Sequence, residues 1–253
     1  MQHYNTDWLI EKHYNGEKLL YLFFWGHTTN NTLEVNKACL SQWFPLPFTV
    51  DGVTYANAEH WMMANKALLF SDIDSYEKIL AAKTPKEAKA LGRLVIGFDD
   101  LVWKDQCYKI VKQGNIHKFN QHPVYAAFLL DTADQIIVEA SPVDKIWGIG
   151  LAESDEDATR PDQWKGKYLL GFALMEVRDF LKGFGHFEQF IADVSLPWKV
   201  YPKIEPNDLF WRMGDGKELL NKFYSYYDAL SERERTIFML TNPAPLQWQS
   251  MLK

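Results

Sequence analysis

Residues 57–70, with the sequence NAEHWMMANKALLF, constrain the fold more than any other segment of the chain. Asn57 is a favourable N-cap, and the residues after it are apolar nearly all round, a pattern that predicts a buried helix. Hydrophobic residues make up 47% of the chain and charged residues 24%, close to the average of globular proteins and unlike disordered chains. The sequence therefore predicts a globular domain built around a buried helix.

The segments around this helix predict more helices than strands. Thr84, Pro85 and Glu87 form a strong helix start, because Thr caps, Pro suits the first helical position and Glu follows three residues after the cap. We also expect helices at 74–82, 100–120, 123–130 and 168–181, strands at 19–25 and 135–140, a hairpin at 48–55, and a Thr- and Asn-rich loop after Trp25. Helices and strands do not alternate regularly, so the predicted class is α+β, a predominantly helical single domain with a few short strands.

A break in the pattern divides the chain near residue 183. Gly183 and Gly185 follow a helical stretch, and three prolines then interrupt residues 197–206, which predicts an extended connector. The predicted main domain covers residues 18–183, and residues 184–253 form a connector and a helical C-terminal extension. In the extension we expect one helix with an apolar face at 219–227 and a second that begins at Ser231 with a capping box.

Composition excludes several classes of protein. No apolar run reaches the roughly 20 residues that cross a bilayer, and the N-terminus does not resemble a signal peptide. Two cysteines are too few for a disulfide framework, which favours a cytoplasmic location, and seven histidines show no metal-ligand spacing. We therefore expect no metal and no cofactor. The net charge of −6 lacks the basic signature of proteins that grip nucleic-acid backbones.

Two charged side chains interrupt the apolar helix at 57–70. Glu59 and Lys66 lie seven residues apart, which places them on nearly the same helix face and roughly 10 Å apart along the axis. One interpretation is a partly buried ion pair, or two groups that reach out to water. The other is a carboxylate and an amine that line one pocket. His60 points elsewhere on the helix, and we expect a hydrogen-bonded core histidine there.

A second candidate site follows the predicted strand at 135–140. Ser-Pro turns the chain there, and the loop after it presents Asp144, Trp147 and Gly148. An aromatic face beside a glycine suits a bound ligand, although an ordinary turn with Trp147 in the core is the alternative. Arg93 is a candidate phosphate ligand or a structural ion pair, and Trp103 a candidate stacking residue or a core residue.

Several blocks in order resemble the NADAR or YbiA-like superfamily. The blocks are CLSQW at 39–43, YANAEHWMMANK at 55–66, LGR at 91–93, Trp103, EASPVDKIWGIG at 139–150 and WKGK at 164–167. This resemblance covers about residues 20–182 and implies a YbiA-like α+β fold that acts on N-glycosidic bonds at ribose. The family's glutamate and lysine fall on Glu59 and Lys66, its tryptophan on Trp103, and its aspartate on Asp144. Gln42 and Trp43, which we place in the substrate pocket, depart from a common Asn-Phe.

The predicted reaction is metal-independent hydrolysis of the ribose C1′–N bond of a ribosylamino-pyrimidine phosphate. Its transition state is a cationic sugar, so an ionised Glu59 near C1′ stabilises it, with Asp144 as second carboxylate. Trp103 and Trp147 would stack on the base or grip the sugar. Lys66 either holds Glu59 or a phosphate, or attacks C1′ as a Schiff-base nucleophile.

Three other functions remain open at this stage. The family resemblance also implies an enzyme that removes ADP-ribose from guanine bases, with the modified base in nucleic acid as partner. A non-catalytic module that binds ADP-ribose or NAD is the second alternative. A structural protein that assembles through its C-terminal extension is the third. The decisive observation is whether Glu59, Lys66, Asp144 and Trp103 line one pocket.

Overall fold

A computed structural model describes residues 4–27 and 35–252 of the chain. It contains two compact units, one made of residues 1–49 and 54–186 and the other of residues 50–53 and 187–253. The Thr- and Asn-rich loop expected after Trp25 falls largely on residues 28–34, outside the described residues. No helix within 4–27 and 35–252 is long and apolar enough to cross a membrane.

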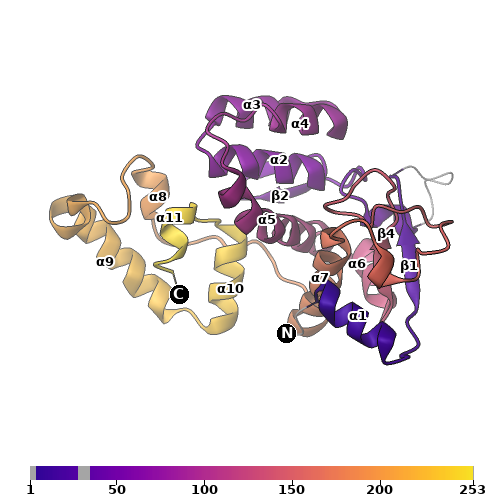
Figure 1. Ribbon diagram of the computed structural model, residues 1–253. Coiled ribbons are helices and arrows are strands. Elements are labelled where there is room, and N and C mark those ends of the chain that lie inside the picture. Colours follow the sequence, from indigo (N-terminus) through magenta and orange to yellow (C-terminus); the bar gives the residue numbers. More distant parts are fainter. Residues whose placement is uncertain (1–3, 28–34, 253) are drawn as a thin grey trace. The chain divides into compact units, whose positions relative to one another are not determined.

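The first unit is mainly helical (Figure 1). Its α-helices are α1 (Thr6–Tyr14), α2 (Ala58–Leu69), α3 (Ile73–Ala81), α4 (Pro85–Gly92), α5 (Asp100–Asn120), α6 (Pro123–Asp131) and α7 (Leu169–Phe184). Its strands are β1 (Tyr21–Phe24) and β4 (Ile136–Glu139), and two short 3-10 helices, η1 (Lys37–Leu40) and η2 (Pro161–Gln163), complete it. The hairpin strands β2 (Phe48–Val50) and β3 (Val53–Tyr55) belong to it except for residues 50–53. The predicted α+β class with few short strands is confirmed.

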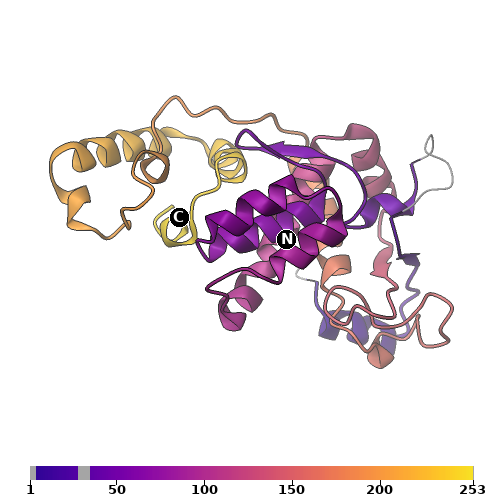
Figure 2. The same ribbon diagram turned by 90° about the horizontal axis from the view of Figure 1, so that it is seen from above.

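Helix α2 is the centre of this unit. Figure 1 shows it between the α3–α4 pair and α5, and it packs against all three. In the view from above (Figure 2), the purple helices of residues 58–92 lie side by side. The Asn57 side chain caps α2 by accepting from the N–H groups of Glu59 and His60, each at 3.1 Å. His60 is buried and bonds Asn57 and the Ala82 carbonyl, so the predicted core histidine is confirmed.

Capping and turn residues in the sequence predicted the positions of most of the other helices and strands. Thr84 accepts from the Glu87 N–H at 3.1 Å with Pro85 at the first helical position, and the turn residues Asp51 and Gly52 both have positive φ. One predicted start was wrong: α3 begins at Ile73, because Asp72 accepts from the Ser75 N–H at 3.0 Å and caps the helix instead of Asp74.

The two longer strands meet although more than a hundred residues separate them in sequence. β1 pairs with β4 in parallel, with Tyr21 opposite Ile136 and Phe24 opposite Glu139. Helix α7 packs against β4 and α5 and covers the sheet. The end of β4 therefore lies beside the end of β1, which positions the loop that follows residue 139.

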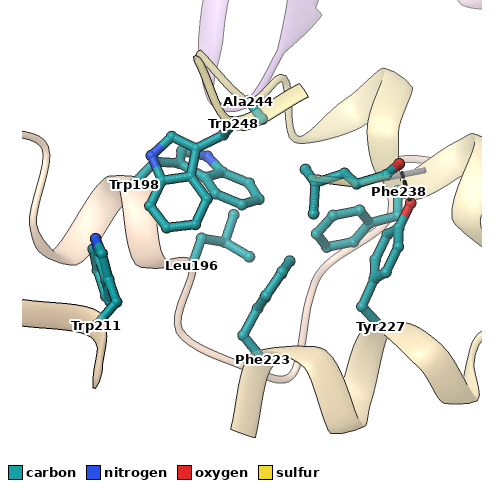
Figure 3. Close-up of a cluster of buried hydrophobic side chains, with 9 residues drawn as sticks. Leu196, Trp198, Trp211, Phe223, Tyr227, Phe238, Ala244 and Trp248 are labelled. Atoms are coloured by element: carbon teal, nitrogen blue, oxygen red, sulfur yellow. Dashed lines mark hydrogen bonds between the residues drawn. The ribbon is translucent and has the colours of Figure 1, made fainter. Parts of the chain in front are cut away.

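The second unit has a hydrophobic core of its own. Its elements are α8 (Pro197–Val200), η3 (Leu209–Arg212), α9 (Gly214–Ala229), α10 (Glu232–Thr241) and α11 (Leu246–Gln249). Figure 3 shows Trp198, Trp211 and Trp248 grouped with Phe223 and other apolar side chains. The Trp211 and Trp248 rings meet edge to face with centroids 5.2 Å apart. The predicted capping box at Ser231 is present.

Candidate active site

A cavity of about 550 Å³ lies in the first unit where the ends of several elements meet. The start of α2, one face of α4, the end of β4 and the loop after β4 supply its walls. The residues around it are Trp25, Gly26, His27, Ser41, Gln42, Trp43, Glu59, Met62, Lys86, Lys89, Ala90, Arg93, Glu139, Ser141, Val143, Asp144, Trp147 and Leu170. Six of the nine residues predicted for the site are among them: Gln42, Trp43, Glu59, Arg93, Asp144 and Trp147.

Glu59 projects into this cavity from the first turn of α2. The residue is 4% exposed, and its backbone N–H is held by the Asn57 side chain and the Gln42 carbonyl. Its Oε1 has no hydrogen-bond partner within the described residues. Burial raises the pKa of Glu59 to about 7, although Lys89, a hydrogen bond from Trp43 and Arg93 oppose that rise. The carboxyl group therefore changes charge near neutral pH.

Glu139 is a second carboxyl group on the cavity, partly buried, and the sequence did not point to it. It is the last residue of β4, and its Oε2 has no hydrogen-bond partner within residues 4–27 and 35–252. Burial, with Asp144 and Glu59 nearby, raises the pKa of Glu139 to about 8. Its position as the acidic end of an otherwise apolar strand was the signal available in the sequence.

Asp144 both stabilises the turn after β4 and lines the cavity. Its Oδ1 accepts from the N–H groups of Ile146 at 2.9 Å and Trp147 at 2.8 Å, which makes it the key residue of a turn. The same residue lines the cavity with Trp147. The turn thus fixes the aspartate and the indole relative to the end of β4.

Cations of α4 line another wall of the cavity. Lys86 and Lys89 lie three residues apart on α4, Arg93 is the C-cap residue that follows the helix, and all three border the cavity. The Lys89 amine lies 5.9 Å from the centre of a Trp43 ring. Sequence reasoning named only Arg93; the helical spacing from residue 86 to 93 was the signal that identifies the two lysines.

A buried polar pair lies behind Gln42. The Asn115 Nδ2 donates to Gln42 Oε1 at 2.9 Å, and it also donates to the Val111 carbonyl. This bond leaves the Gln42 Nε2 buried with no hydrogen-bond partner among the residues described. Gln42 itself is 7% exposed and borders the cavity, so its amide N–H group is available to an acceptor on a ligand.

Three predicted residues, Lys66, Trp103 and Gly148, do not line this cavity. The Lys66 Nζ donates to the Gly92 carbonyl at 2.8 Å and lies 5.5 Å from the centre of a Trp103 ring, so these two residues meet each other instead. The expectation that they share one cavity with Glu59 and Asp144 is corrected, because the seven-residue separation places Lys66 at the other end of α2.

Gly148 is buried in the loop and serves its packing. A Cβ atom there would lie 2.9 Å from the Glu139 carbonyl and 3.1 Å from that of Asp144. The glycine therefore allows the loop to fold closely against the end of β4, instead of giving a ligand access to the backbone.

Within residues 4–27 and 35–252, no group of three or more His, Cys, Asp or Glu side chains is arranged to hold a metal ion. Cys39 and Cys107 are both buried and unpaired with each other. The chemistry of the cavity rests on carboxyl groups, cations and aromatic rings.

The comparison with known families agrees with this arrangement. The model of the NADAR domain matches residues 23–182, which is most of the first unit. The chain belongs to the NADAR domain family. The matched region contains every cavity residue described above.

Individual relatives support the same assignment. The chain is 41% identical over 164 residues to the N-glycosidase R617 of Acanthamoeba polyphaga mimivirus, covering 63% of this chain and 95% of the relative. It is 32% identical over 135 residues to the N-glycosidase YbiA of Escherichia coli, covering 53% of this chain and 76% of YbiA. A riboflavin biosynthesis protein of Vibrio vulnificus is 29% identical over 64% of this chain and 41% of that protein.

The fold of the family is also known from a solved structure. The NMR structure of E. coli YbiA matches this chain with a TM-score of 0.51 and 25% sequence identity. The match covers 69% of this chain and 94% of YbiA. The predicted YbiA-like fold of the NADAR domain is confirmed.

Proposed function

We propose that this NADAR protein hydrolyses the ribose C1′–N bond of a ribosylamino-pyrimidine phosphate. The chain is an N-glycosidase, the enzyme class that its relatives carry in their names. The finer proposal of a pyrimidine substrate is supported by the relative named for riboflavin biosynthesis. In this proposal the substrate is a small ribosylated molecule. A cytoplasmic location remains our prediction from the sequence.

One observation carries the proposal: Glu59 lines a cavity of about 550 Å³, is 4% exposed, and has an Oε1 with no hydrogen-bond partner within the described residues. Cleavage of a ribosyl C–N bond generates positive charge on C1′ and the ring oxygen. A carboxylate fixed in a site that excludes water stabilises that charge more strongly than water does. In this proposal Glu59 faces C1′ and Asp144 stands as a second carboxylate or as a ligand of the ribose hydroxyls.

The opposite charge on α4 supports a phosphorylated substrate. Lys86, Lys89 and Arg93 supply cations to the cavity, and Arg93 suits bidentate contact with a phosphate. The cavity therefore combines carboxyl groups suited to the sugar with cations suited to the phosphate. The faces of Trp43 and Trp147 are available to stack on the base, a contact worth about 1–3 kcal/mol per base.

The test is product release from two substrates by the full chain. The protein is incubated with a ribosylamino-pyrimidine phosphate and, separately, with DNA that carries ADP-ribosylated guanine. We expect release of the pyrimidine amine, and a loss of about 100-fold or more in kcat for Glu59→Gln. The matched control is Glu77→Gln, which changes an exposed glutamate on α3 and keeps the wild-type rate.

The other outcomes separate the alternatives. Release of ADP-ribose from guanine without cleavage of the ribosylamine would move the protein to the alternative reaction. Tight binding of ADP-ribose with no turnover of either substrate, unchanged in Glu59→Gln, would contradict the proposed hydrolysis and favour a binding module.

A further inference from the structure

Glu139 is held rigidly at the cavity, and it has no role in the hydrolysis proposed for Glu59 and Asp144. Its backbone is held on both sides, since Phe24 pairs opposite it on β1 and its own carbonyl accepts from the Ile149 N–H at 3.0 Å. The next residue, Ala140, donates its N–H to the Phe24 carbonyl at 2.9 Å. The side chain therefore leaves a rigid strand end and lines the same cavity as Glu59.

The surroundings of the two glutamates differ in their charge. Burial and Asp144 oppose ionisation of Glu59, whereas Lys89, a hydrogen bond from Trp43 and Arg93 favour its ionised form. At Glu139, burial and the carboxyl groups of Asp144 and Glu59 oppose ionisation, and among the described residues Lys89 favours it. The neighbouring charges therefore favour ionisation more at Glu59 than at Glu139.

A protonated Glu139 has the chemistry that the leaving group requires. An amine departs from C1′ readily only when its nitrogen receives a proton as the bond breaks. Glu139 lines the cavity, and its buried Oε2 has no hydrogen-bond partner within the described residues, so none of their groups holds a proton carried there. The raised pKa of Glu139, about 8, keeps that proton in place at neutral pH.

We propose that Glu139 is the general acid of the glycosidase reaction, an inference that rests on the proposed hydrolysis of a ribosylamine. The C1′–N bond breaks with its electron pair passing to nitrogen, and the nitrogen takes the proton of Glu139. Water bonds to C1′ and loses a proton to the ionised Glu59. Transfer of that proton to Glu139 through water restores both groups, and the products are the free amine and ribose 5-phosphate.

The test compares two leaving groups in the full chain. The first substrate is the ribosylamino-pyrimidine phosphate, and the second is a ribosylpyridinium 5′-phosphate, whose pyridine leaves as a neutral molecule and needs no proton. For Glu139→Gln we expect kcat to fall about 100-fold or more on the amine and to change less than about threefold on the pyridinium. The matched variant Glu59→Gln lowers kcat on both substrates, because both pass through the cationic sugar.

The pH profile of the wild-type chain gives a second readout, which needs no substitution of Glu139. We expect wild-type kcat on the amine to fall as the pH rises through about 8, where Glu139 loses its proton. The other titratable groups on the cavity are Glu59, Asp144, His27, Lys86 and Lys89, and Arg93 adds a fixed charge. The alkaline fall persists in His27→Gln, which separates Glu139 from the imidazole.

Each contrary result has a distinct meaning. Equal losses on both substrates in Glu139→Gln, or a wild-type kcat on the amine that does not fall above pH 8, would overturn the role of Glu139 while leaving the hydrolase intact. If the pyridinium is not a substrate, the pH profile alone decides. A wild-type chain that releases no amine at any pH contradicts the proposed function itself.

Discussion

The Lys66 amine donates to the carbonyl of Gly92, the last residue of α4, at 2.8 Å. It also lies 4.1 Å from the centre of the Phe98 ring, so both a helix end and an aromatic face hold it. Burial lowers the pKa of Lys66. This contact joins the end of α2 to the end of the helix that carries the cations of the cavity.

The bond between Lys66 and Gly92 predicts a structural effect of substitution. Lys66→Ala removes a charged donor from a carbonyl, and we expect the free energy of unfolding to fall by about 1–3 kcal/mol in a thermal or urea melt. Lys66→Arg, which keeps a donor and a cation, should lose less. Borohydride trapping during turnover is expected to give no adduct on Lys66, and an adduct there would contradict this placement.

Glu59 predicts a dependence of stability on pH. Its pKa rises from 4.5 in the unfolded chain to about 7 in the fold, so the native state binds more protons between these values and loses stability as the pH rises through them. The full penalty, present above pH 7, is roughly 3 kcal/mol. We expect Glu59→Gln to unfold at a higher temperature than the wild type at pH 8. At pH 4 the Glu59 carboxyl is mostly protonated in both the folded and the unfolded chain, so the variant and the wild type should unfold at similar temperatures. The same difference in unfolding temperature at pH 4 and pH 8 would contradict the prediction.

The position of the Gln42 amide predicts that its removal weakens substrate binding. The variant Gln42→Ala removes the Nε2 donor, which has no partner among the described residues, and we expect KM to rise about tenfold while kcat stays within about threefold. Asn115→Ala is the matched variant, because it only releases the orientation of the Gln42 amide and should raise KM by less. A KM for Gln42→Ala equal to that of the wild type would show that no substrate acceptor meets this amide.

Gly148 predicts a loss of stability. A Cβ atom there would lie 2.9 Å from the Glu139 carbonyl, and neither this backbone nor that of Asp144 is free to yield. We expect Gly148→Ala to lower the free energy of unfolding by about 1–3 kcal/mol. Gly183→Ala is the control, since open space surrounds that position, and a melt that ranks the two variants equally would refute the argument.

The burial of Trp198 predicts that its substitution destabilises the core of the second unit. It is 5% exposed and its ring lies 5.3 Å from Phe223, so Trp198→Ala should cost about 3–5 kcal/mol in the core shown in Figure 3. Limited proteolysis with mass spectrometry should then show faster cleavage within residues 187–252 than within residues 54–186. The control is Ile191→Ala, which changes an apolar residue that is 88% exposed. Equal cleavage of the two variants would contradict the predicted core role.

Local chemistry made much of the fold predictable. Asn57, Thr84 and Ser231 accept from backbone N–H groups at the helix starts that their positions predict. Asp51 and Gly52 form the expected turn with positive φ. These signals act within a few residues, so the sequence is enough to read them. The start of α3 was misplaced because Asp72 and Asp74 are equally good caps in sequence, and Asp72 also accepts from the distant Ile96 N–H at 2.8 Å.

The candidate site was predictable only in part. The family resemblance and the motif at 139–150 brought Glu59, Asp144 and Trp147 into consideration, and the structure places all three on the cavity. Lys66 lies on the same helix as Glu59, yet it meets Gly92 at the other end. Spacing along a helix gives a shared face but not a shared pocket, because the neighbours of that face change along the axis.

By itself, the sequence determined the helix starts, the hairpin turn, the buried character of α2 and the family of the chain. Tertiary structure alone decided that the end of β4 lies beside the end of β1, and so that Glu139 joins Glu59 on one cavity. It also decided that the cations of α4 face these carboxyl groups. Caps and turns depend on neighbours in the chain, whereas the protonation of a buried carboxyl depends on charges that only folding brings within reach.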